Sequence, residues 1–179
     1  MKILSRGTCL ALALALLIVG FASPLPASGA GSASLRIPGA GFRPSSNTAG
    51  FEYYYRSSMY ATSSPGVWWT APVHLPQGAM ITNVRMYYYD SNATYDCNGQ
   101  FMVCDFATEG GFHSPYWSSS GSAGFGYADS AAINHTVDNT QYGYLLLWRP
   151  NAADSSIRLE GFQIFYTPPP GRAAVIPLY

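Results

Sequence analysis

The chain has 179 residues, of which only 10% are charged, and its formal net charge is zero at pH 7. This balance excludes attachment to nucleic acid or to an anionic membrane by electrostatic attraction. Hydrophobic residues make up 48% of the chain, which is enough for one globular domain with a core.

Residues 1–30 are expected to form a signal peptide. They start with the basic residues Lys2 and Arg6, continue with an apolar run at 10–21, and end in small residues before a cleavage point at Ala30. The apolar run is shorter than the roughly 20 residues that a membrane-spanning helix needs. The sequence therefore predicts a secreted or cell-surface protein with no membrane span after cleavage.

The rest of the chain has the pattern of an all-β protein. Glycine, proline, serine and asparagine separate short runs rich in β-branched and aromatic residues. Strands are predicted at 51–55, 67–73, 80–89, 100–106, 131–137, 142–148 and 157–167, with shorter ones near Leu35 and at 113–117. This number of short strands favours a single antiparallel β-sandwich or jelly-roll-like domain over residues 31–167.

Two of these strands indicate which side chains are buried. The alternation in 157–167 changes phase at Gly161, where a β-bulge would return all the apolar residues to one face. These residues are Ile157, Leu159, Phe162, Ile164 and Tyr166. In the strand at 80–89, the face expected to lie in the core carries Met80, Thr82, Val84, Met86 and Tyr88.

Turn chemistry and composition assign the other segments. The strand at 142–148 is apolar on both faces, as is typical of a central strand, and 138–141 is predicted to form its hairpin turn with the preceding strand. The segments 29–34 and 118–126 are rich in glycine and serine and are interpreted as a linker and a mobile loop. Residues 168–179 start with three prolines, which cannot continue a sheet, and are predicted to form a C-terminal tail.

Cys97 and Cys104 are the two cysteines outside the leader, and an exported pair favours a disulfide. If both lie on one extended strand, a spacing of seven residues puts the sulfurs on opposite faces and too far apart to bond. A looser loop would allow the bond. A disulfide and two separately packed thiols therefore both remain open.

A resemblance to a known family rests on two groups of motifs. The first is the string 71–82, followed by Tyr87-Tyr88-Tyr89-Asp90, Ala93-Thr94 and Asp96. The second is Val137-Asp138-Asn139, Tyr142, Tyr144, Arg158-Leu159, Gly161 and Tyr166-Thr167. Over residues 36–167 the chain resembles a broad, unnamed family of secreted bacterial β-sandwich proteins of unknown function. The resemblance implies the fold and export, and it implies no catalytic residue.

No grouping of residues indicates catalysis or a bound cofactor. The histidines His74, His113 and His135 have no second ligand at the spacing of a metal site. The segment 90–96 begins like a calcium loop, but residue 95 is not glycine and Phe101 stands where the closing glutamate belongs, so a polar turn is favoured. The sequence therefore predicts a protein that is not an enzyme and holds no metal or cofactor.

Aromatic clusters are the remaining functional candidates. Neighbouring strand residues point to opposite faces, so each cluster is expected to send at least one ring outward. The candidate binding residues are Trp68, Trp69, Tyr87 and Tyr89. The main hypothesis is a structural or adhesive surface protein that associates with itself. The alternative is a carbohydrate-binding module that stacks extracellular glycans on these rings.

Overall fold

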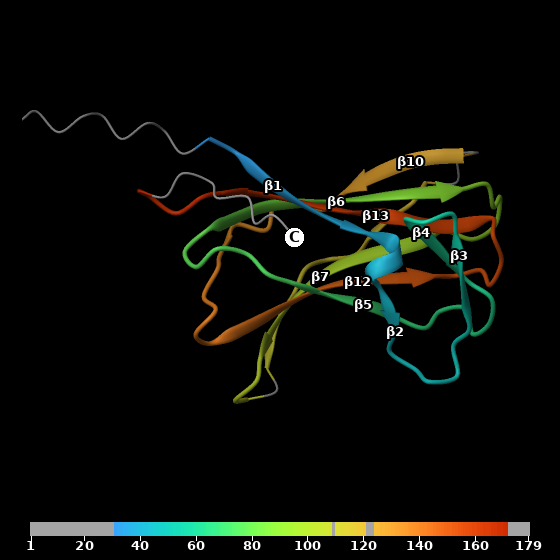
Figure 1. Ribbon diagram of the computed structural model, residues 1–179, viewed down its shortest axis with the longest axis horizontal. Helices are drawn as coiled ribbons and strands as arrows, with labels where there is room; N and C mark the ends of the chain where they lie inside the picture. Colours follow the sequence, from blue (N-terminus) through green and yellow to red (C-terminus); the bar gives the residue numbers. More distant parts are fainter. Residues whose placement is uncertain (1–30, 109, 121–123, 172–179) are drawn as a thin grey trace, which may run out of the picture.

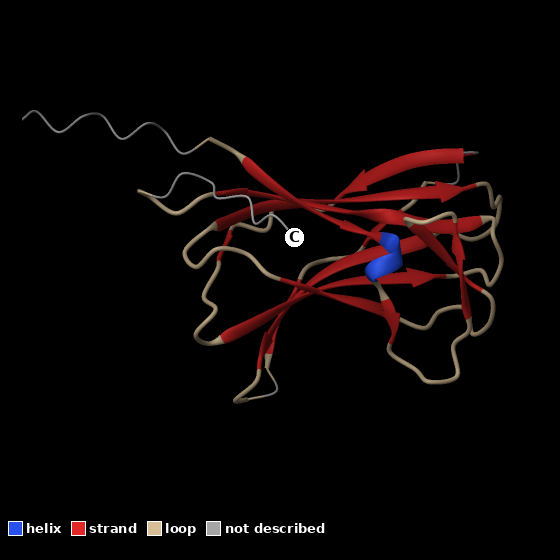
Figure 2. Ribbon diagram, viewed as in Figure 1, coloured by secondary structure: helices blue, strands red, loops and turns tan. Residues whose placement is uncertain are grey.

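The computed structural model describes residues 31–108, 110–120 and 124–171, so the predicted leader and most of the predicted tail lie outside the described residues. The described chain folds into two antiparallel β-sheets stacked as two layers, which confirms the predicted all-β sandwich (Figures 1 and 2). Within the described residues, no helix has the length and hydropathy needed to cross a membrane.

The two layers are named here sheet I and sheet II. Sheet I contains β1 (Ala33–Pro38), β3 (Phe51–Tyr54), β4 (Ser58–Ala61), β6 (Met80–Asp90), β10 (Gly124–Asp129), β11 (His135–Thr136) and β13 (Ile157–Thr167). Sheet II contains β2 (Arg43–Pro44), β5 (Trp69–Val73), β7 (Cys97–Asp105), β8 (Gly111–His113), β9 (Trp117–Ser118) and β12 (Tyr142–Pro150). A 3-10 turn, η1 (Gly39–Gly41), follows β1 and leads to β2 in the other sheet.

The order of the strands places β6 and β13 at the centre of sheet I. Sheet I runs β10-β6-β13-β4-β3, with β1 also paired to β13 and β11 to β6. Sheet II runs β2-β5-β12-β7-β8, with β9 also paired to β7. The predicted central strand at 142–148 is therefore confirmed as β12, between β5 and β7.

Large aromatic side chains fill the space between the sheets. Trp69 and Trp148 are fully buried, with ring centroids 6.1 Å apart. Phe162 of sheet I stacks on Phe42 at 5.3 Å and meets the edge of Trp117 of sheet II at 6.3 Å. Burying one such side chain contributes about 1.5–3 kcal/mol, so these rings join the two layers.

The predicted bulge at Gly161 is confirmed. The pairing of β13 with β6 shifts between Leu159 and Gly161, which leaves Glu160 as the extra residue. Gly161 has φ +155°, and a Cβ there would lie 2.7 Å from the carbonyl oxygen of Ile37. The five apolar residues predicted to share a face are all buried, because the extra residue restores the alternation.

The predicted inner face of β6 is correct for its second half and wrong for its first half. Val84, Met86 and Tyr88 are buried, as expected. At the start of the strand, however, Ile81 is buried, whereas Met80 is 38% exposed. The reason is a second irregularity, where the pairing passes from Phe165↔Asn83 to Tyr166↔Ile81 and skips Thr82.

Several predicted loops and turns were also wrong. Part of the segment interpreted as a mobile loop continues into the edge strand β10, in which small residues alternate with Phe125, Tyr127 and Asp129. The short strands β2 and β4 were not predicted. The strand predicted at 131–137 is reduced to β11, which pairs with β6 rather than β12. The segment 138–141 is therefore a connection between the sheets and not a hairpin turn.

Of the two interpretations left open for the cysteines, the structure agrees with two separate free thiols and not with a disulfide. Both lie on the single extended strand β7, and a spacing of seven residues separates their Cα atoms by about 20 Å or more. Disulfides need a Cα separation below about 7 Å. Cys97 points into the core, where burial raises the pKa of its thiol to about 11, and Cys104 is partly exposed.

A buried polar contact links the two sheets at the end of β6. The Asp90 side chain is fully buried, and its Oδ2 accepts a hydrogen bond of 2.5 Å from Ser119 Oγ, next to β9. Ser119 Oγ in turn accepts a hydrogen bond from the backbone N–H of Cys97 at 2.9 Å. Buried polar groups are stable when they are paired in this way, so the contact fixes the end of sheet I against sheet II.

Candidate binding groove

The outer face of sheet I carries a group of aromatic side chains on β6 and β10. Alternate residues of these strands point outward, and the register pairs Phe125 with Tyr89 and Tyr127 with Tyr87. The ring centroids of these pairs are 5.1 Å and 6.3 Å apart. Phe125 is 76% exposed and Tyr127 57% exposed, so the face offers open ring surface to a ligand.

Arg85 holds Tyr127 in place. Its guanidinium donates two hydrogen bonds to Asp129, at 2.7 Å and 2.8 Å, and its Cζ lies 3.9 Å from the centroid of the Tyr127 ring. The hydrogen bonds to Asp129 also raise the pKa of Arg85 above its ordinary value. Cation–ring and bidentate contacts together restrict the side chains that make them.

Arg158 holds the ring of Tyr89 in place, and its own side chain is buried. Its Cζ lies 3.5 Å from the centroid of Tyr89 and 4.0 Å from that of Tyr54, so the guanidinium is held between two rings. It also donates a hydrogen bond of 3.0 Å to the carbonyl of Ser155. Phe125 packs edge-to-face on Tyr89, so Arg158 supports the most exposed of these rings from below.

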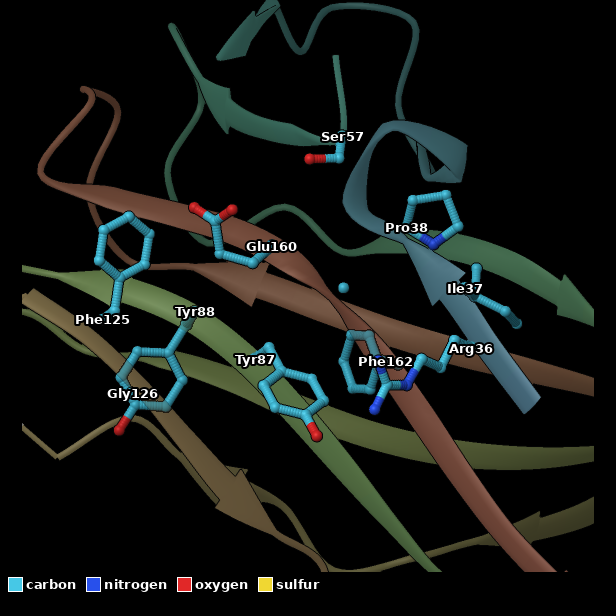
Figure 3. A pocket seen from close by; sticks show the side chains of 11 residues that line it. Arg36, Ile37, Pro38, Ser57, Tyr87, Tyr88, Phe125, Gly126, Glu160 and Phe162 are labelled. Carbon is cyan, nitrogen blue, oxygen red and sulfur yellow. The ribbon is translucent and has the colours of Figure 1, made fainter. Parts of the chain in front are cut away.

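A groove of about 480 Å³ opens beside these rings, above the bulge of β13 (Figure 3). Its polar lining comes from Arg36, Ser57 and Glu160, on three different strands or turns, and its aromatic lining includes Tyr87 and Phe125. The volume lies within the 300–1,000 Å³ that is typical of small-ligand sites.

Tyr87 is fixed at the wall of the groove by a chain of hydrogen bonds. Its hydroxyl donates to Gln163 Oε1 at 2.8 Å, and Gln163 Nε2 donates to Ser34 Oγ of β1 at 2.9 Å. This chain runs across three neighbouring strands of sheet I. The ring is therefore positioned before any ligand arrives.

Glu160 supplies the one carboxylate among the described residues that line the groove. Its Oε1 is buried without a hydrogen-bond partner in the described part of the chain, and it lies 3.7 Å from Arg158 Nε. Burial raises the pKa of Glu160, and the charge of Arg158 opposes this shift. The bulge places this side chain, since Glu160 is the extra residue of β13. The side chain as a whole is 22% exposed, so Glu160 contributes a partly desolvated carboxyl group to the groove lining.

A second hollow, about 520 Å³ in volume, lies at the end of the same sheet. Its lining is mostly polar: Ser91, Asn92, Asp154, Ser155 and Ser156, together with Ala93, Tyr89 and Arg158. Tyr89 lines this hollow and Phe125 lines the groove, and the two rings are in contact with each other. The two recesses therefore flank one aromatic ridge.

The segment 90–96, which begins like a calcium loop, is a polar turn. Asn92 Oδ1 accepts hydrogen bonds from the backbone N–H groups of Thr94 and Tyr95, each at 2.9 Å, and Asp90 Oδ1 accepts one from the backbone N–H of Asn92 at 3.0 Å. These side-chain oxygens bind the turn's own backbone. Within the described residues, no three histidine, cysteine or acidic residues come together in a way that could hold a metal ion.

The structure separates the four candidate residues taken from the sequence. Tyr87 lines the groove, and Tyr89 lines the polar hollow. Trp68 is on the outer face of the other sheet, where it packs against Tyr116. Trp69 is fully buried in the core, so its selection as a binding residue was wrong, because in this strand the second tryptophan of the pair points inward.

Sequence analysis missed several residues of the groove. Phe125 was placed in a mobile loop, although alternation of large and small residues at 124–129 was a signal of a strand. Gly126 lets β10 pass close over the ring of Tyr88, since a Cβ there would lie 2.9 Å from it. Arg36 and Glu160 had no local signal, because β1 and the bulge are brought together only by the fold.

No protein-family model matches the chain, and no curated protein matches it in sequence. Among solved structures, it is similar to a xylan-binding module of family CBM15, with 11% identity over 79% of this chain and 100% of that one, at a TM-score of 0.48. It is also similar to the C-terminal CBM6 of LamC, a laminarinase from Zobellia galactanivorans, with 12% identity over 74% and 98% and a TM-score of 0.47. A third is a family 35 carbohydrate-binding module from Clostridium thermocellum, with 13% identity over 74% and 97% and a TM-score of 0.45.

At these levels of identity and overlap, none of these structures assigns a function to this chain. The β-sandwich that the sequence resemblance implied is confirmed by the two sheets. The further expectation of an unnamed family of unknown function has no matching family model behind it and stays a prediction.

Proposed function

We propose that the protein is a non-catalytic carbohydrate-binding domain that holds a glycan in the groove on the outer face of sheet I. One observation carries the proposal: an exposed ring, Phe125, and a fixed ring, Tyr87, line the same recess as Arg36, Ser57 and Glu160. A sugar ring has an apolar C–H face and a rim of hydroxyls. Aromatic surface suits the first, and charged or hydroxyl groups that donate and accept hydrogen bonds suit the second.

Rigidity of the groove favours binding. Arg85 and Arg158 hold the outer rings, and Gln163 holds Tyr87. Side chains that are fixed before binding lose little conformational entropy when the ligand arrives. A flexible set of tyrosines would weaken the same contacts.

The number of carboxylates in the groove lining also favours binding over catalysis. Glycoside hydrolysis commonly uses two carboxyl groups on either side of the scissile bond. The described lining of the groove offers Glu160 alone. A secreted or cell-surface location, which residues 1–30 predict, suits a glycan ligand. Self-association of the protein stays a prediction.

The test is retention of the purified protein on a panel of polysaccharides in affinity electrophoresis: xylan, mixed-linkage β-glucan, β-1,3-glucan, mannan, galactan and pectin. We expect selective retention by one or a few polymers. Phe125→Ala should weaken it about tenfold, or about 1.4 kcal/mol, with no change in melting temperature, because the ring is mostly exposed.

Phe106→Ala is the matched control, since this ring is 80% exposed and lies outside the groove lining. Its retention should equal that of the wild type. The proposal fails if no polymer retains the wild type, or if Phe125→Ala and Phe106→Ala behave alike.

A further inference from the structure

A second aromatic surface lies on the outer face of sheet II. The rings of Trp68 and Tyr116 pack with their centroids 5.4 Å apart and their planes at 35°. Tyr116 is 58% exposed. The Cζ of Arg149 lies 5.1 Å from the centroid of Trp68 and 6.0 Å from that of Tyr116, and Arg149 Nε is buried without a hydrogen-bond partner among the described residues.

The outward direction of this pair follows from its neighbours. Trp69 and Trp117, the residues next in sequence, point inward and are buried in the core. Trp68 and Tyr116 come directly before β5 and β9, and Arg149 of β12 lies over both rings. Strand residues alternate between faces, and the neighbour of Arg149, Trp148, is buried in the core, so Arg149 and the two rings lie on the outer side of sheet II. The contact of Trp117 with Phe162 shows that this inward side faces sheet I.

The groove and the Trp68–Tyr116 pair therefore lie on opposite outer faces of the sandwich. The two sheets of a sandwich lie about 10 Å apart, and the outer side chains extend this separation on both sides. One extended glycan chain cannot lie on both outer faces without bending around the edge of the molecule. Two sites in this arrangement would each take a different chain.

We propose that Trp68, Tyr116 and Arg149 form a second glycan contact, and that a single copy of the protein links two polysaccharide chains through its opposite faces. The inference rests on the proposed function of the groove and adds a cross-linking activity to it. The contact has no recess comparable to the groove, so it relies on ring stacking and on the Arg149 guanidinium.

The experiment combines the same polymer panel with light scattering. Purified protein is added in increasing ratio to each soluble polymer that retains it, and scattering is compared with that of the protein alone. A two-site linker should raise scattering to a maximum at an intermediate ratio and lower it again in excess protein. Tyr116→Ala and Phe125→Ala should each abolish the maximum while keeping at least a tenth of the wild-type retention.

Two further variants complete the design. The double variant Tyr116→Ala/Phe125→Ala should lose retention. Phe106→Ala removes an exposed ring directly after β7 that belongs to neither contact, and it should behave as the wild type. Melting temperatures establish that each variant is folded.

Each outcome is decisive. If the wild type is retained but produces no scattering maximum, the second contact is overturned and the groove stands. If Tyr116→Ala still produces the maximum, the linkage comes from another surface or from self-association, and the proposal is likewise overturned. If no polymer retains the wild type, the proposed function fails together with this inference.

Discussion

The two outer faces of the sandwich hold their aromatic side chains in different ways. On sheet I, the guanidinium groups of Arg85 and Arg158 lie over aromatic rings, and a groove opens between the rings and the bulge of β13. On sheet II, Trp68 and Tyr116 pack on each other with Arg149 beside them. If both faces bind glycans as proposed, we expect the recess with its several polar groups to select among ligands, and the open ring pair to discriminate less between them.

The largest expected effect is a loss of stability on replacing the buried Trp69, compared with a small loss on replacing its neighbour Trp68. Trp69→Ala should destabilise the fold by about 3–5 kcal/mol, because it leaves a cavity between the sheets. Trp68→Ala should cost less than about 1 kcal/mol but reduce retention on the polymer. Chemical denaturation of both variants checks the difference. Equal losses of stability would mean that both tryptophans belong to the core.

The next effect tests the bulge that shapes the groove of sheet I. Gly161→Ala should destabilise the protein by about 3 kcal/mol, since its backbone has φ +155° and the new Cβ would press on the carbonyl of Ile37. Gly41→Ala is the control, because its Cβ would meet the nearest atom at an ordinary 3.7 Å. Thermal unfolding of the pair measures the effect, and similar melting temperatures would contradict this description of the bulge.

A smaller effect tests the polar contact that joins the two sheets. Ser119→Ala removes one of the hydrogen bonds to the buried Asp90 carboxylate and the acceptor of the Cys97 N–H. We expect a loss of about 1–3 kcal/mol in the free energy of unfolding. Ser118→Ala, at the neighbouring exposed position, should change it little. A Ser119→Ala variant as stable as the wild type would show that the contact does not couple the sheets.

The smallest effect concerns the pH dependence of the groove. Burial raises the pKa of Glu160, so the folded state binds this proton more tightly than the unfolded chain. The stability that it contributes is complete below the ordinary glutamate pKa of about 4.3 and is lost as the pH rises through the raised value. Glu160→Gln should therefore reduce the fall in melting temperature as the pH rises above about 4. An unchanged profile would mean that Glu160 is not desolvated in the folded protein.

Strong local patterns allowed much of the fold to be predicted from the sequence. The strand at 157–167 was predicted with the bounds that β13 has and with its bulge, because a glycine at a change of phase is typical of a β-bulge. The edge strand β10 was missed, since its glycines have the composition of a linker. Its pairing with β6 depends on the rest of the sheet.

The candidate site was harder to predict, for a physical reason. Tyr87 and Tyr89 were selected because outward rings are expected on a strand. Their partners Phe125, Arg36 and Glu160 come from distant segments, and only the assembled sheet brings them together. Trp68 and Trp69 are the same residue type at adjacent positions, so the sequence does not show which ring is buried. The pairing of β5 with β12 sets Trp69 opposite Trp148, and both rings point into the core.

The most direct test of the central claim is to map the ligand on the protein. A ¹⁵N-labelled sample would be titrated with oligosaccharides of the polymer that retains it, and backbone chemical shifts would be followed. We expect the largest changes around the groove, at Arg36, Tyr87, Phe125 and Gly161, with a separate set near Tyr116. Saturable changes that leave the groove residues unaffected would contradict the assignment of the site.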